Sequence, residues 1–121
     1  KGSALYNYIK SGELKSEGNS ITEGIGSSRI TKNFENAKID GAFSIDDHEA
    51  LPILYDLIQN EGLSLGTSCG INIAGAIRLG KELGPGKTIV TIVFPGPSSF
   101  ASLIAPAIFI PQLVPKLKPS F

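Results

Sequence analysis

The spacing of apolar side chains predicts three helices. Apolar residues at i, i+3 and i+4 favour a short helix over Ala4–Lys10. A longer amphipathic pattern predicts a helix over Asp47–Asn60, capped by Asp46 or Asp47 at its start and stopped by Gly62. A third helix is expected over Ile71–Leu83, where a Gly-Pro-Gly turn ends it.

Two apolar stretches predict strands. Ala42–Ile45 is short, whereas Thr88–Val93 is β-branched and uncharged, which is typical of a strand buried on both faces. Helices that alternate with strands indicate an α/β class with a parallel sheet. Ile21–Ile30 is expected to be a loop, and its glycines on either side of Ile25 should supply positive φ or allow a close approach to the backbone.

The last quarter of the chain differs from the rest in its charge and proline content. No charged residue occurs from Thr88 to Pro115, and six of the eight prolines lie between Pro95 and Pro119. We expect an irregular tail over 94–121. A membrane span needs about 20 apolar residues. This run is shorter and is broken by prolines, so membrane insertion is not expected.

The 121 residues suffice for about one domain. Their composition argues against several classes of function. Lys+Arg and Asp+Glu balance at 11 each, which argues against a nucleic-acid partner. One cysteine cannot form an internal disulfide, and one histidine leaves little for a metal site, so no metal is expected. The chain begins at Lys1 rather than Met, and we interpret it as a fragment of something longer.

The Gly66–Gly70 segment (GTSCG) is expected to be a tight turn before the third helix. It also fits the G-x-S-x-G pattern of a hydrolase nucleophile, which would be Ser68. The single histidine, His48, precedes Ser68, so the base required by that mechanism is out of order. The same segment could bind an anion at the start of the following helix, or Thr67 or Ser68 could simply cap that helix. Cys69 is interpreted as a small structural residue rather than a reactive thiol.

Three segments carry a family resemblance when they are read together. TEGIGSSRIT, EGLSLGTSCGIN and GPGKTIVTI occur in this order, and the stretch Gly2–Val93 resembles the C-terminal part of cysteine synthase, or O-acetylserine sulfhydrylase. The resemblance implies an α/β fold, part of the three-layer fold of fold-type-II pyridoxal phosphate (PLP) enzymes, with a parallel sheet flanked by helices. Residues 1–93 would form the C-terminal portion of the PLP-dependent domain, and 94–121 a divergent, Pro-rich tail.

The resemblance also implies an activity for the whole protein. The family uses PLP to convert O-acetylserine and sulfide into cysteine and acetate by β-replacement, as a cytoplasmic homodimer. The lysine that holds PLP as a Schiff base and the loop that binds its phosphate have no counterpart in this chain. We therefore expect a fragment that is inactive alone and holds no catalytic residue. The alternatives are a non-catalytic fragment that pairs with a full-length subunit and, less favoured, a serine hydrolase using Ser68.

Four residues are implied to bind the cofactor. Gly24 would lie against the PLP ring, and the Gly24-Ile25-Gly26 loop would close the substrate pocket. Ser68 would lie near the base of the cleft. The family places a serine that binds the pyridine nitrogen where this chain has Gly96, and we interpret the switch after Val93 as a frameshift, a read-through or a spliced variant.

Overall fold

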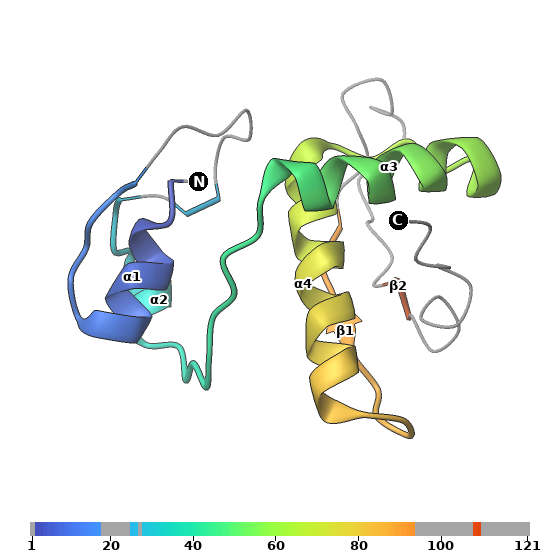
Figure 1. Ribbon diagram of the computed structural model, residues 1–121. Helices are drawn as coiled ribbons and strands as arrows, with labels where there is room; N and C mark the ends of the chain where they lie inside the picture. The colour runs from blue at the N-terminus through green and yellow to red at the C-terminus, as the bar shows by residue number, and fades with distance from the viewer. Residues whose placement is uncertain (1, 18–24, 27, 94–107, 110–121) are drawn as a thin grey trace.

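The computed structural model describes residues 2–17, 25–26, 28–93 and 108–109. Figure 1 shows two parts, with the N-terminal helices at one end and the later helices and strands at the other, joined by an extended segment. The elements in chain order are α1 (Ala4–Ser11), α2 (Lys32–Glu35), α3 (Asp47–Glu61), α4 (Thr67–Leu83), β1 (Val90–Thr91) and β2 (Ile108–Phe109).

The N-terminal part consists of α1 and α2. The predicted first helix is confirmed, and it ends at Gly12, whose φ of 79° is left-handed. The sequence analysis did not predict α2, which spans only four residues, too few for a periodic signal. Its cap is Thr31, whose side chain accepts a hydrogen bond from the Phe34 N–H at 3.3 Å. The rings of Tyr8 and Phe34 pack α1 against α2, with their centroids 6.2 Å apart.

The predicted second helix is confirmed as α3. Asp46 Oδ1 accepts a hydrogen bond from the His48 backbone N–H at 2.9 Å, so Asp46 is the cap. Gly62 ends the helix in the left-handed conformation with φ 67°. Pro52 lies inside α3 without ending it.

The third helix, α4, begins at Thr67, four residues before the predicted start at Ile71. The Gly66–Gly70 segment, expected to be a tight turn, forms the first turn of this helix, and the Cys69 N–H donates to the Gly66 carbonyl at 3.0 Å. Small residues in sequence suggested a turn, but their backbone hydrogen bonds are helical. Gly84 ends α4 as predicted.

The two predicted strands are confirmed only in part. Ala42–Ile45 is extended, but it is not a strand within the described residues, because backbone hydrogen bonds between described residues give it no ladder partner. Only Val90–Thr91 of the predicted second strand forms β1, which pairs antiparallel with β2. The described pairing is thus antiparallel where a parallel sheet was predicted. β2 falls in the tail expected to be irregular, whose remaining residues lie outside the described part.

The predicted burial of β1 on both faces is also wrong. Thr91 and Val93 are buried, whereas Val90 and Ile92 are 65% and 63% exposed. α4 covers one face of β1, and no described element covers the other. The described residues are therefore compatible with an α/β fragment, and the three-layer arrangement stays a prediction.

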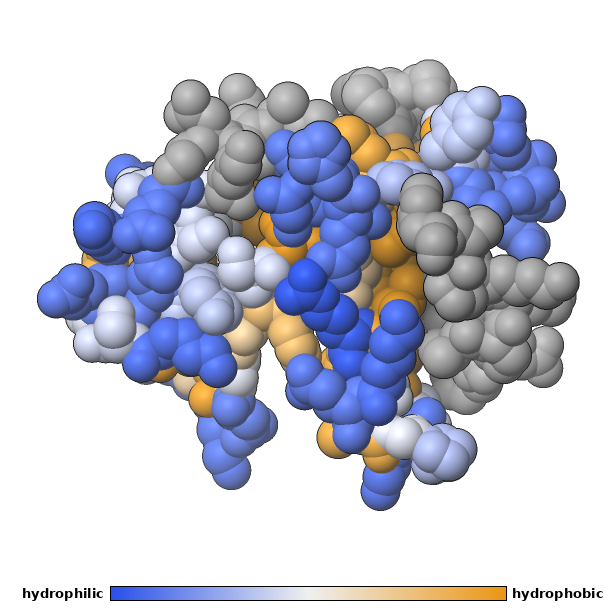
Figure 2. All heavy atoms as spheres, in the orientation of Figure 1, coloured by the Kyte–Doolittle hydropathy of each residue, from blue (hydrophilic) through white to orange (hydrophobic). Residues whose placement is uncertain are grey.

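The core lies between α3 and α4. One buried cluster joins Leu57, Cys69, Ile73 and Val93, and a second joins Ile45, Ala50 and Ala74. Figure 2 shows hydrophilic side chains over the front of α4 and hydrophobic residues along its sides. No helix in the described part of the chain combines the length and apolar character that a membrane crossing requires.

Candidate functional site

A hollow of about 170 Å³ lies where the two parts of the molecule meet. Its walls come from α1, from the loop at 25–26, from the extended segment 42–45 and from α4. Most of the lining is apolar, and three of the described side chains that form it bring hydroxyl groups. The apolar side chains include Leu5, Ile9, Ile25, Phe43, Ile45 and Ile71, and the hydroxyls belong to Ser3, Tyr6 and Ser44.

The lining limits the chemistry of this hollow. None of the described residues that line it is charged, so these residues offer neither a carboxylate nor an amine to a bound group. The hydroxyls of Ser3, Tyr6 and Ser44 can donate and accept hydrogen bonds. The hollow therefore suits a flat or apolar portion of a ligand that carries a few polar atoms.

The structure brings only some of the predicted site residues together. Ile25 and Gly26 line the hollow. Ser68 lies half-buried in the first turn of α4 and is not part of the lining, although Ile71 in the next turn is. Gly24 and Gly96 lie outside the described residues. The cofactor roles of these residues stay predictions.

Two features of the structure explain why position 26 is a glycine. Its φ is +68°, a left-handed value that side chains rarely adopt. A Cβ atom there would lie 2.6 Å from the carbonyl oxygen of Gly2. Both expected uses of a loop glycine, positive φ and close approach, therefore hold at Gly26. The group that approaches is the chain's own backbone.

The start of α4 does not form a hydrolase site with the single histidine. No hydrogen bond joins Ser68 to His48 in the described part of the chain, and the His48 backbone N–H binds Asp46. Cys69 is 1% exposed in the core, which confirms its structural role. The prediction that Thr67 or Ser68 caps the helix is wrong, because Gly66 is the cap residue and no side chain accepts a capping hydrogen bond.

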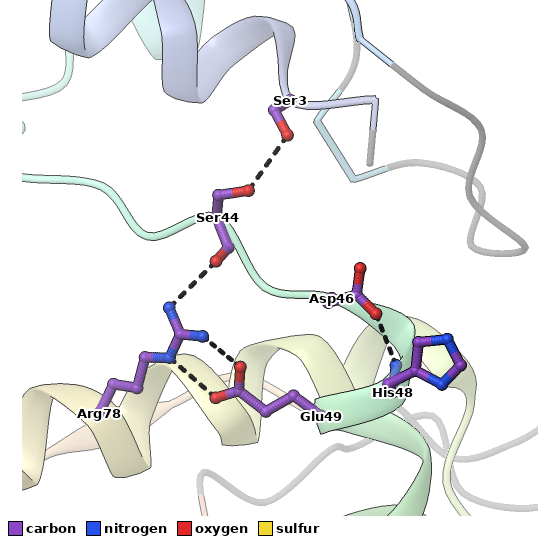
Figure 3. Close-up of polar contacts among 6 residues, drawn as sticks. All are labelled: Ser3, Ser44, Asp46, His48, Glu49 and Arg78. Atoms are coloured by element: carbon purple, nitrogen blue, oxygen red, sulfur yellow. Dashed lines mark hydrogen bonds and ion pairs between the residues drawn. The ribbon is translucent and has the colours of Figure 1, made fainter.

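Sequence reasoning missed a series of polar contacts that leads from α3 and α4 to the lining of the hollow (Figure 3). Arg78 donates from Nε to Glu49 Oε1 at 2.8 Å, from Nη2 to Glu49 Oε2, and from Nη1 to the Ser44 carbonyl at 3.1 Å. The Ser44 and Ser3 hydroxyls are hydrogen-bonded at 3.2 Å. Glu49 lies in the first turn of α3, where a carboxylate is favoured on local grounds alone. One signal was available, since Arg78 is the only charged residue from 62 to 80.

PLP does not fit these residues as a complete group. Its phosphate calls for basic side chains or free backbone N–H groups, and its aldehyde calls for a lysine amine. Among the described residues, no lysine or arginine lines the hollow. The described residues offer an apolar wall for the face of a ring, but neither end of the cofactor finds a charged partner among them.

Comparison with known proteins gives a consistent set of relatives. No family model matches the chain. It is 39% identical over 104 residues to cysteine synthase 1 of Emericella nidulans, covering 83% of this chain and 28% of that protein. It is 38% identical over 104 residues to cysteine synthase 1 of Neurospora crassa, with the same coverage. It is 36% identical over 102 residues to cysteine synthase of Dictyostelium discoideum, covering 76% of this chain and 27% of that protein. The chain thus spans somewhat more than a quarter of the length of these curated relatives.

Proposed function

We propose that this chain, a relative of the cysteine synthases over most of its length, is a piece of a PLP-dependent enzyme that makes cysteine and acetate from O-acetylserine and sulfide. The observation that carries the proposal is the 39% identity across 83% of the chain. A match of that extent leaves less than a fifth of the chain outside it, so the loop at Ile25–Gly26 and Ser68 fall within. The whole protein would act as a homodimer.

The contribution of the described residues is a wall of the ligand pocket. Ile25, Phe43 and Ile71 supply apolar surface that excludes water, and the Ser3 and Ser44 hydroxyls can orient a polar atom. In a complete enzyme PLP supplies the electron sink for β-replacement. Its amine and phosphate partners would have to come from parts of the protein that this chain does not contain.

The isolated 121-residue chain is expected to make no cysteine. It should be incubated with PLP, O-acetylserine and sulfide, and cysteine should be compared with that formed by PLP alone. Treatment with borohydride should then attach PLP sparsely to several surface lysines, because no described lysine lines the hollow. Cysteine formation above the PLP control, together with PLP on one lysine at full occupancy, would contradict the proposal.

A second function, pairing with a full-length cysteine synthase subunit, is favoured by the uncovered face of β1. Val90 and Ile92 are 65% and 63% exposed on that face, and neighbouring exposed apolar side chains favour a contact with another protein. Co-expression with a tagged full-length subunit should recover the chain, and Ile92→Lys should abolish recovery. Tyr55→Lys, at a position on α3 that is also 63% exposed, should not. Equal recovery of both variants, or none of the original chain, would sink this function.

A further inference from the structure

We infer that Arg78 is a positioning residue for the hollow: it fixes the segment 42–45 against α3 and α4, and through Ser44 it sets the place of α1. The inference rests on the proposed function only in treating this hollow as part of a ligand site. Arg78 itself does not line the hollow. It acts through residues that do.

Arg78 and Glu49 form a hydrogen-bonded ion pair. The two residues lie on α4 and α3, and the guanidinium faces the carboxylate through two parallel hydrogen bonds. A planar guanidinium makes this fork-to-fork arrangement, and a lysine ammonium cannot. The pair therefore fixes the direction of the guanidinium, and with it the direction of the remaining donor, Nη1.

The second step is the contact from Nη1 to the wall. Nη1 donates to the Ser44 carbonyl at 3.1 Å, whereas backbone hydrogen bonds between described residues do not reach 38–45. The burial of Ile45 anchors one end of this segment in the core, at 6% exposure. The Arg78 contact fixes the residue beside it. Phe43, Ser44 and Ile45 all line the hollow, so the place of this wall depends on Arg78.

The third step carries the effect across the hollow. The Ser44 hydroxyl is hydrogen-bonded to the hydroxyl of Ser3, the residue that precedes α1. Figure 3 shows Arg78 on α4, Ser44 on the extended segment and Ser3 before α1 joined one after another. Loss of the Ser44 contact should therefore free α1 as well as the wall.

The experiment measures the distance between α1 and α4 in the full 121-residue chain. Nitroxide labels are placed at exposed Lys10→Cys and Lys81→Cys, and Cys69 is left in place because it is 1% exposed. Double electron–electron resonance should give one narrow distance distribution in the parent chain. Arg78→Met and Arg78→Lys should both lose it and give a broad one, since neither side chain can hold Glu49 and Ser44 together. Helix content by circular dichroism should be unchanged.

The matched control is Lys15→Met. It removes one positive charge and breaks an ion pair, 3.4 Å to Glu17, that lies within the N-terminal part and is exposed. It should keep the narrow distribution. A purely structural role for Arg78 would lower the melting temperature and leave the distance of the folded chain unchanged.

A narrow distribution in folded Arg78→Met or Arg78→Lys overturns the inference. Should Arg78→Met fail to fold, Arg78→Lys decides alone, because it keeps the charge and much of the aliphatic stem. The measurement uses neither PLP nor turnover. A failed distance test therefore leaves the cysteine synthase proposal standing, and a failed activity test leaves this inference standing.

Discussion

Replacing Leu57 with alanine is expected to lower the free energy of unfolding by about 2–5 kcal/mol. Leu57 lies on α3, is 3% exposed, and packs in one cluster with Cys69, Ile73 and Val93. Truncation removes apolar contacts and leaves a cavity between α3 and α4 that the two helices can close only in part. Urea unfolding followed by circular dichroism at 222 nm, a helix signal, measures the change.

The control for this substitution is Leu51→Ala on the same helix. Leu51 is 41% exposed, so the same truncation there should cost about 1 kcal/mol or less. Both variants lose the same atoms and carry the same change in helix propensity. Equal losses at the two positions would mean that Leu57 does not lie in a packed core.

Replacing Gly70 with alanine is expected to lower the free energy of unfolding by about 1–3 kcal/mol, against the usual preference of helices for alanine. A Cβ atom at this position would lie 2.8 Å from both Cγ and Cδ1 of Leu54 and 3.1 Å from the carbonyl oxygen of Ala50. Leu54 is itself buried, at 6% exposure, so its side chain has little room to withdraw. The close packing of α3 on α4 therefore requires glycine at position 70.

Gly75→Ala provides the matched control on α4. A Cβ atom there meets nothing within 4 Å, so alanine should raise stability by about 0.5–1 kcal/mol through its helix propensity. Introducing Leu54→Ala should remove the clash at Gly70, so that Gly70→Ala costs less in that background than in the parent chain. A stabilising Gly70→Ala in the parent chain would show that the two helices are not packed this closely.

The helices could be predicted because their signals are local. The Asp46 cap, the Gly62 stop and the apolar spacing between them lie within one stretch, and α3 follows them closely. The start of α4 was misplaced because Gly66–Gly70 is rich in small residues that serve a turn or a helix equally well. At Gly70 the glycine serves close packing against Leu54 instead.

Strand formation could not be predicted in the same way, because a strand exists only with its neighbour. Ala42–Ile45 has the composition of a strand but finds no ladder partner in the described chain. The uncharged pattern of Thr88–Val93 predicts cover on both faces, whereas Val90 and Ile92 are left exposed. The chain spans only 28% of its relative in Emericella nidulans, so a pattern suited to a larger sheet is consistent with this uncovered face.

In the candidate site, too, local features could be predicted and contacts between distant residues could not. The glycine loop could be singled out from its spacing, and Ile25 and Gly26 do line the hollow. The Arg78 contacts could not be predicted, because Arg78 is separated along the chain by 29 positions from Glu49 and by 34 positions from Ser44. The spacing of apolar residues shows which face of one helix is buried, but it does not show which charged side chains meet between two helices.

This chain is proposed to be one piece of a relative of the cysteine synthases whose cofactor partners lie elsewhere in the protein. Sequencing the full transcript tests this proposal most directly. We expect one reading frame that continues upstream of Lys1 and encodes the PLP lysine and the phosphate-binding loop. A transcript whose open reading frame encodes these 121 residues alone would contradict the claim and would favour pairing with a separate subunit.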